Sequence, residues 1–224
     1  MQATEDTACR VPDLAAIIRG DEPLAIPVRN RGKVIATLRP LTRAALADAA
    51  LLEKLARWRN EHREWFLSQF EAKAADTRQW LEQTVLTDDT RLIFLIEVEG
   101  REAGTIGFLH LTPTSAELER LILGERGGPP ALILASEAAL LRWLFTSFRI
   151  ARVEAIVLAG NFTALQLHRS LGFRIEEKVP LRAVQTENGS VLVECEETAA
   201  ETAKFRMVLE RQAFVDEESG DAAE

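Results

Sequence analysis

The sequence lacks the features that would point to a disulfide scaffold, a zinc protein or a membrane protein. Its two cysteines, Cys9 and Cys195, do not form a CxxC motif, so we expect two reduced thiols in a cytoplasmic protein and no metal site. No apolar run approaches the roughly 20 residues that a membrane-spanning helix needs. Residues 1–10 contain no apolar stretch of the kind found in a secretory signal. We therefore expect no membrane partner.

An excess of positive charge is also missing. Lys and Arg number 27 against 35 Asp and Glu, which gives a formal net charge of −8 at pH 7. Nonspecific nucleic-acid binding depends on basic side chains that neutralise phosphates, so this balance argues against a nucleic-acid partner. It leaves room for a small anionic ligand held by a local cluster of donors.

The chain does have the composition of a globular protein with a core. It has 224 residues, of which 47% are hydrophobic and 28% are charged. Residues 1–22 mix proline, glycine and charges, and we expect a flexible N-terminal segment there. Residues 215–224 are acidic and contain no basic residue, which predicts a disordered tail. The intervening residues 23–214 are expected to form one domain.

The pattern of this domain predicts a mixed α/β (α+β) fold, in which helices flank a mostly antiparallel central sheet. A hairpin is expected at residues 24–38, and Asn161 is expected to cap a short helix that ends before Gly172. The other expected helices cover residues 44–58 (capped by Thr42), 61–74, 76–86 and 131–145. The other expected strands cover residues 92–98, 103–111, 116–123, 152–158, 173–181, 191–195 and 205–209.

Two local patterns suggest chemistry. A glycine-rich loop precedes the expected helix 131–145, and a helix N-terminus presents free backbone N–H groups to an anion such as a pyrophosphate. The alternative is a plain strand-to-helix turn. In the later helix, Asn161, Ala164 and His168 lie near one face because they are spaced by three and four residues.

These patterns resemble the core of the Gcn5-related N-acetyltransferase (GNAT) superfamily. The matching text is AELERLILGERGG, ASEAALLRWLF and AIVLAGNFTALQLHRSLGF, where Asn, Ala, a ring-bearing residue and Gly-Phe follow a strand at the family's spacing. LRPLT, ARWRNEHREWF and RQWL are similar to the branch of ribosomal-protein N-terminal acetyltransferases and sugar-nucleotide amine acetyltransferases. The resemblance extends from about Thr37 to Val208.

The resemblance implies transfer of an acetyl group from acetyl-CoA to a primary amine, without a metal. A base takes the proton of the attacking amine, backbone donors of a splayed strand stabilise the oxyanion, and an acid, usually a tyrosine, protonates the thiolate. His168 occupies the tyrosine position, and imidazole can act as an acid near neutral pH. The residues implied to bind acetyl-CoA are Leu121, Leu123, Arg126, Gly127, Gly128, Ala131 and Asn161.

Glu119 is our choice for the base, with Glu117 and His110 as the other candidates. Glu117 and Glu119 lie on one, mostly apolar face of the expected strand, where a carboxylate has a raised pKa that suits a base. Alternatively, both are ordinary surface acids at a solvated strand end.

Four residues in the segment that covers the acceptor side in the resembling family are candidates for substrate binding: Arg57, Arg59, Asn60 and His62. Arginines there can hold a diphosphate or an acidic peptide. Alternatively, they pair with neighbouring glutamates. The tryptophans fall within helical patterns and are expected to be core anchors rather than a substrate platform: Trp58, Trp65, Trp80 and Trp143.

The phosphate-binding loop departs from the family pattern. Its signature falls on Gly128, Ala131 and Ile133, or two residues earlier on Arg126, Pro129 and Ala131. Pro129 and Pro130 lack the N–H that a phosphate would need.

The alternative function is therefore a catalytically inactive relative that binds a ligand or partner. A third is a structural or complex-forming protein that forms a homodimer through the hairpin at 24–38 and the late strands. The acceptor stays open between an amino sugar nucleotide and a protein N-terminus.

Overall fold

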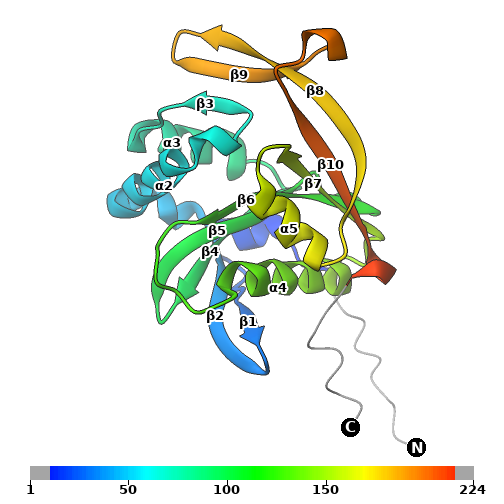
Figure 1. Ribbon diagram of the computed structural model, residues 1–224. Coiled ribbons are helices and arrows are strands. Elements are labelled where there is room, and N and C mark those ends of the chain that lie inside the picture. The colour runs from blue at the N-terminus through cyan, green and yellow to red at the C-terminus, as the bar shows by residue number, and fades with distance from the viewer. Residues whose placement is uncertain (1–10, 215–224) are drawn as a thin grey trace, which may run out of the picture.

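Ten strands form one continuous sheet in the computed structural model, which describes residues 11–214 (Figure 1). The strands are β1 (Ile26–Asn30), β2 (Lys33–Pro40), β3 (Ser68–Phe70), β4 (Leu92–Val98), β5 (Arg101–Leu109), β6 (Ser115–Leu123), β7 (Arg152–Leu158), β8 (Arg174–Thr186), β9 (Gly189–Glu194) and β10 (Thr202–Glu210). Their order is β1-β2-β4-β5-β6-β7-β10-β8-β9-β3. Within these described residues, only β6 and β7 pair in parallel. The mixed α/β fold with a mostly antiparallel sheet is thus confirmed.

Helices cover both faces of this sheet. They are α1 (Leu14–Arg19), α2 (Ala49–Glu61), α3 (Ala74–Trp80), α4 (Leu132–Ser147) and α5 (Phe162–Ser170). On one face, Trp143 of α4 packs edge-on against Phe94 of β4, with ring centroids 5.8 Å apart. The neighbouring Ile93 points to the opposite face, toward α2 and α3, because successive side chains of a strand alternate. The two faces therefore have separate partners.

The first described residues are part of the core. Leu14, Ile17 and Ile18 have helical spacing and are buried, and the side chain of Asp13 caps α1 by accepting a hydrogen bond from the Ala16 N–H at 3.1 Å. The expected flexible segment 1–22 is thus wrong for its second half. Residues 1–10 and the expected acidic tail 215–224 lie outside the described residues.

The segment after β2 differs from the expectation. Residues Arg43–Ala47 form a short 3₁₀ helix, and α2 begins later, where Asp48 caps it by accepting a hydrogen bond from the Leu51 N–H at 3.0 Å. Thr42 makes no side-chain cap. The helix expected over residues 61–74 is also wrong, because this stretch contains β3, which pairs with β9. Pairing with a strand far away in the chain has overridden a local helical pattern.

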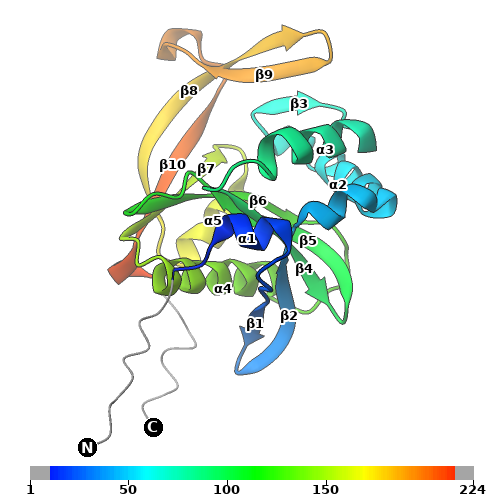
Figure 2. The same cartoon turned by 180° about the vertical axis from the view of Figure 1, so that it is seen from behind.

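The hairpin of β8 and β9 projects from the sheet and meets β3 (Figure 2). Gly189 makes this contact possible, since a Cβ atom there would lie 2.2 Å from the Gln69 carbonyl oxygen. β3 is therefore held against both α2 and the hairpin. The expected hairpin of β1 and β2 is confirmed, and Val34 is an exposed apolar residue on it. Its use in a homodimer stays a prediction.

Candidate active site

The parallel pair at the centre of the sheet separates part-way along its length. Residues 115–118 of β6 pair with residues 152–155 of β7, and the ladder then stops. β6 nevertheless continues to Leu123 and β7 to Leu158. A gap with no strand-to-strand hydrogen bonds therefore opens between residues 119–123 and 156–158.

A β-bulge in β6 accompanies this separation. Glu119 pairs with Gly107 and Ile122 pairs with Thr105, so Arg120 and Leu121 together oppose one residue of β5. Arg120 has a φ of 56°, in the left-handed region, and its carbonyl oxygen accepts a 2.7 Å hydrogen bond from the Thr105 hydroxyl. A bulge bends its strand and redirects a side chain. Here it sends the side chain of Arg120 to the face covered by α2 and α3.

The loop from β6 to α4 continues from this gap. Gly124 lies flat against Trp58, where an added Cβ atom would come within 2.1 Å of the indole ring. Ala131 precedes α4 with a φ of 61° and caps it with no side-chain hydrogen bond. The first N–H groups of α4 have no partner within the helix, although the Leu132 N–H already donates to the Pro129 carbonyl oxygen at 3.2 Å. Pro129 and Pro130 have no backbone N–H, so this loop offers two fewer hydrogen-bond donors to an anion.

The residues expected to bind acetyl-CoA lie around one end of the gap. Leu121 and Leu123 are on β6, the exposed Arg126, Gly127 and Gly128 are in the loop, and Ala131 precedes α4. Asn161 follows β7 and caps α5 as expected, by accepting a hydrogen bond from the Ala164 N–H at 3.1 Å. These segments meet because the carboxyl ends of adjacent parallel strands share one edge of the sheet.

His168 is buried and bonded to a carboxylate that the sequence analysis missed. Its Nδ1 lies 2.6 Å from Oε1 of Glu137 on α4, and the His168 ring lies 5.1 Å from the Phe173 ring. Glu137 is 0% exposed, and its Oε2 has no hydrogen-bond partner in the described structure. The signal in the sequence was a single charged residue within the apolar run 131–141.

The candidate bases are all engaged by other residues. Both oxygens of Glu119 accept hydrogen bonds from the Arg91 guanidinium at 2.5 Å. Burial raises the pKa of Glu119, and the hydrogen bonds and charge of Arg91 oppose that shift. Glu117 has His110 3.4 Å away, and His110 is exposed. The expected raised pKa therefore applies to Glu119, with burial as its main cause.

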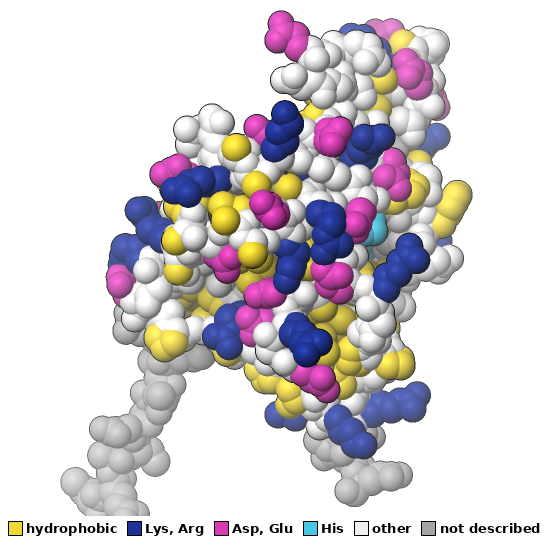
Figure 3. All heavy atoms as spheres, turned by 90° about the vertical axis from the view of Figure 1, so that its left-hand side faces the viewer, with side chains coloured by type: hydrophobic (Ala, Val, Ile, Leu, Met, Phe, Trp, Pro, Cys, Tyr) yellow, Lys and Arg dark blue, Asp and Glu magenta, His cyan; other side chains and the backbone are white. Residues whose placement is uncertain are grey.

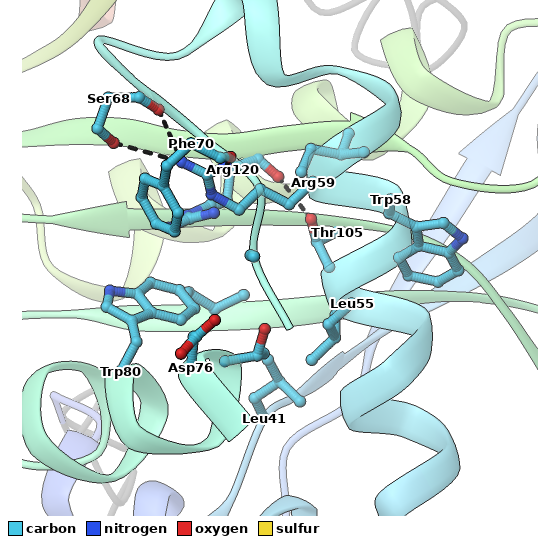
Figure 4. Close-up of a pocket in the computed structure, with 14 residues that line it drawn as sticks. Leu41, Leu55, Trp58, Arg59, Ser68, Phe70, Asp76, Trp80, Thr105 and Arg120 are labelled. Atoms are coloured by element: carbon cyan, nitrogen blue, oxygen red, sulfur yellow. Dashed lines mark hydrogen bonds between the residues drawn. The ribbon is translucent and has the colours of Figure 1, made fainter. Parts of the chain in front are cut away.

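A cavity of about 180 Å³ lies on the other side of the bulge, between the sheet and α2, α3 and β3 (Figure 4). Its lining is mostly apolar and aromatic, with two guanidinium groups and one carboxylate. The residues that line it are Leu41, Leu55, Trp58, Arg59, Ser68, Phe70, Ala72, Asp76, Thr77, Trp80, Ile93, Thr105, Arg120 and Ile122. Trp58 and Trp80 both line this cavity, and both are core anchors as expected, since Trp58 is fully buried and Trp80 packs against the core. Trp65 is exposed, so the expectation is wrong for it.

Of the four expected substrate-binding residues, only Arg59 lines this cavity. Arg57 is exposed and bonds to Glu61 and Glu125. Asn60 exchanges two 2.8 Å hydrogen bonds with the backbone of Ala72, and Nε2 of His62 lies 3.1 Å from the Leu123 carbonyl oxygen.

Arg59 itself holds the cavity wall in place. Its guanidinium donates to the carbonyl oxygens of Phe70 and Ser68 at 2.8 and 2.7 Å, and burial lowers its pKa. These bonds join β3 to α2. They also satisfy carbonyl groups of β3 that the short strand does not pair.

The face of the molecule on which α2 and α3 lie carries charges of both signs (Figure 3). Acidic and basic side chains alternate over it without a continuous basic patch. Within residues 11–214, no helix is long and apolar enough to cross a membrane. The same part of the chain contains no group of three or more potential metal ligands.

Comparison with known proteins assigns this architecture to a family. The family model described as "Acetyltransferase (GNAT) domain" matches residues 36–174. No curated protein sequence matches the chain.

Solved structures share the fold at low sequence identity. RimL, a ribosomal L7/L12 alpha-N-protein acetyltransferase in complex with coenzyme A, is 16% identical with a TM-score of 0.65, over 85% of this chain and 99% of that one. Spermidine N-acetyltransferase from Vibrio cholerae, in complex with CoA and spermine, is 15% identical with a TM-score of 0.62, over 81% and 98%. Mycobacterium smegmatis RimJ, in complex with CoA-disulfide, is 20% identical with a TM-score of 0.58, over 85% and 87%. With the family model covering more than half of its length, the chain belongs to the GNAT acetyltransferase family.

Proposed function

We propose that this protein transfers the acetyl group of acetyl-CoA to a primary amine bound in the cavity next to Arg120. The observation that carries the proposal is the gap between residues 119–123 of β6 and 156–158 of β7. The backbone groups along it suit the amide-containing arm of CoA, which can take the place of the missing strand neighbour. CoA bound in several structures of the same fold supports this assignment.

The loop and α4 would hold the diphosphate of CoA. The residues that fit this role are Arg126, Gly127, Gly128 and Ala131, followed by the N–H groups of the first turn of α4. Asn161 and the edge residues Leu121 and Leu123 would contact the remainder. Acetyl-CoA supplies the activated acetyl thioester, and the protein supplies positioning and proton transfer.

The reaction needs one base and one acid. The amine nitrogen bonds to the carbonyl carbon, the carbon–sulfur bond breaks, the amine proton passes to the base, and the thiolate takes a proton from the acid. We assign Glu119 as the base, acting directly or through water, since burial raises its pKa. Backbone N–H groups at the bulge would stabilise the oxyanion.

We assign the acid to His168, with Glu137 as its positioning residue. A carboxylate bonded to Nδ1 fixes the tautomer and the orientation of the ring. The chain contains no tyrosine, so the usual acid of the resembling family is not available anywhere in it.

The assignment of Glu137 is tested by Glu137→Gln, with Glu187→Gln in an exposed turn as the control. We expect kcat to fall by about tenfold or more, with the KM for acetyl-CoA unchanged. A purely structural role would lower the melting temperature and leave kcat of the folded enzyme unchanged.

Two acceptor classes remain in the proposal, an amino sugar nucleotide and a protein N-terminus. Acetylation of polyamines and of ribosomal protein by enzymes of the same fold supports an amine acceptor. Release of CoA thiol in the presence of each class tests the choice. We also keep the cytoplasm as the expected location.

The second candidate is a relative that binds a partner and catalyses nothing. Pro129 and Pro130 favour it, because each removes one N–H from the loop. Titration with acetyl-CoA separates the two functions, since the second predicts no binding.

A further inference from the structure

The cavity contains a guanidinium group that has no hydrogen-bond acceptor. Among residues 11–214, no side-chain or carbonyl oxygen accepts a hydrogen bond from the side chain of Arg120. The adjacent carboxylate of Glu119 uses both oxygens for Arg91. Five N–H donors of Arg120 thus remain for water or for a ligand in the cavity.

Aromatic rings hold this guanidinium in place. Its carbon lies 4.0 Å from the centre of the Trp80 ring and 5.1 Å from that of Phe66. Such stacking fixes the plane of the guanidinium and leaves its edge free. A planar edge with two parallel N–H groups matches a carboxylate.

The charge of the lining agrees with this geometry. Arg59 and Arg120 line the cavity, and Asp76 is the single acidic residue among the lining side chains. Oδ2 of Asp76 already accepts a hydrogen bond from the Lys73 N–H at 2.9 Å. Both guanidinium groups would repel a cationic ligand in the cavity, whereas both would attract an anionic ligand.

We infer, on the basis of the proposed function, that the acceptor is an amine that carries a carboxylate, and that Arg120 binds this carboxylate. The remaining lining is mostly apolar, with the hydroxyl groups of Ser68, Thr77 and Thr105, and the cavity of about 180 Å³ suits a small acceptor with an apolar body. Two sources provide this chemistry, a free amino acid and an acidic residue close to a peptide N-terminus. A polyamine has no carboxylate and therefore does not provide this chemistry.

The inference is tested with matched acceptors that differ only in charge. Acetyl transfer to leucine and phenylalanine is compared with transfer to their amides, and peptides with Asp at position two are compared with peptides with Asn there. We expect kcat/KM to be about ten- to a hundredfold higher for the carboxylate member of the productive pair, the usual value of a charged hydrogen bond. The pair that responds identifies the source. Spermidine is the polycation arm, for which we expect no transfer.

Variants of the whole chain connect this preference to one residue. Arg120→Met should remove the preference, Arg120→Lys should keep part of it, and Arg101→Met, at an exposed position, should leave it unchanged. Circular dichroism checks that each variant is folded. Equal rates for acids and amides, or a preference that survives Arg120→Met, would overturn the inference.

A binding measurement separates this inference from the proposed function. Titration of the protein with 3-phenylpropionate and with its amide needs no acetyl transfer. Binding of the acid alone, abolished by Arg120→Met, supports the carboxylate site even if acetyl-CoA does not bind. Acetyl transfer to amines without any effect of the carboxylate retains the proposed function and overturns the inference.

Discussion

Glu137 of α4 and His168 of α5 form a 2.6 Å hydrogen bond within the core, with Glu137 fully buried and His168 5% exposed. Oε2 of the same carboxylate has no partner among the described residues. A buried carboxylate oxygen without a hydrogen-bond partner lowers the stability of the folded protein, so we infer that Glu137 serves the function of the site. The bond also ties α4, at the loop end of the gap, to α5.

This pair leads to a prediction about stability. His168→Phe preserves a ring next to Phe173 but leaves the Glu137 carboxylate buried without a partner, so we expect the free energy of unfolding to fall by about 3–5 kcal/mol. The double variant His168→Phe with Glu137→Leu removes both polar groups. We expect it to recover most of that loss in urea denaturation. Additive losses in the double variant would show that the two residues are not coupled.

A second prediction concerns pH and Arg120. Burial lowers the pKa of Arg120 to about 10, with the charges of Arg59 and Arg91 acting in the same direction and Glu119 opposing them. The guanidinium is charged below that pH and neutral above it. Binding of 3-phenylpropionate should therefore be constant from pH 7 to about 9 and weaken as the pH rises through about 10.

The probe in this experiment has no group that titrates in that range, and its amide is the control. Asp76 is the one acidic side chain that lines the cavity. Affinity that stays constant to pH 11 in a protein still folded by circular dichroism would contradict the lowered pKa of Arg120.

A third prediction concerns the proline loop. Pro130→Ala restores one N–H next to Ala131, at the site proposed for the diphosphate. One added hydrogen bond to a charged acceptor should tighten binding of acetyl-CoA by about tenfold. Pro113→Ala, in the turn after β5, is the matched control and should change nothing. Unchanged affinity for Pro130→Ala would place the diphosphate elsewhere.

Local signals in the sequence predicted much of the fold. Strands 92–98 and 152–158 and the Asn161 cap are confirmed, because alternation, turn residues and capping act over a few residues. The cap at Thr42 was wrong because Asp48, six residues later, offers a carboxylate to the Leu51 N–H. β3 was missed because its partner β9 is more than a hundred residues away.

The cavity could not be predicted from the sequence for a similar reason. Arg57 and Arg59 are two residues apart on α2, yet one lies in solvent with Glu61 and the other is buried against Phe70. Their side chains point to different sides of the helix, and the position of β3 decides which of the two is buried. Arg120 faces the cavity because of a bulge, and a bulge breaks the alternation on which strand predictions depend.

The most direct test of the account is titration of the protein with acetyl-CoA, followed by hydrogen exchange of the complex. We predict micromolar binding and slower exchange of the amides of residues 119–123 and 156–158, which line the gap, and of the first turn of α4. Desulfo-CoA should give the same protection, and ATP alone should give none in the gap. The absence of binding heat, an unchanged melting temperature and unprotected gap amides would contradict the proposed acetyltransferase and favour the inactive relative.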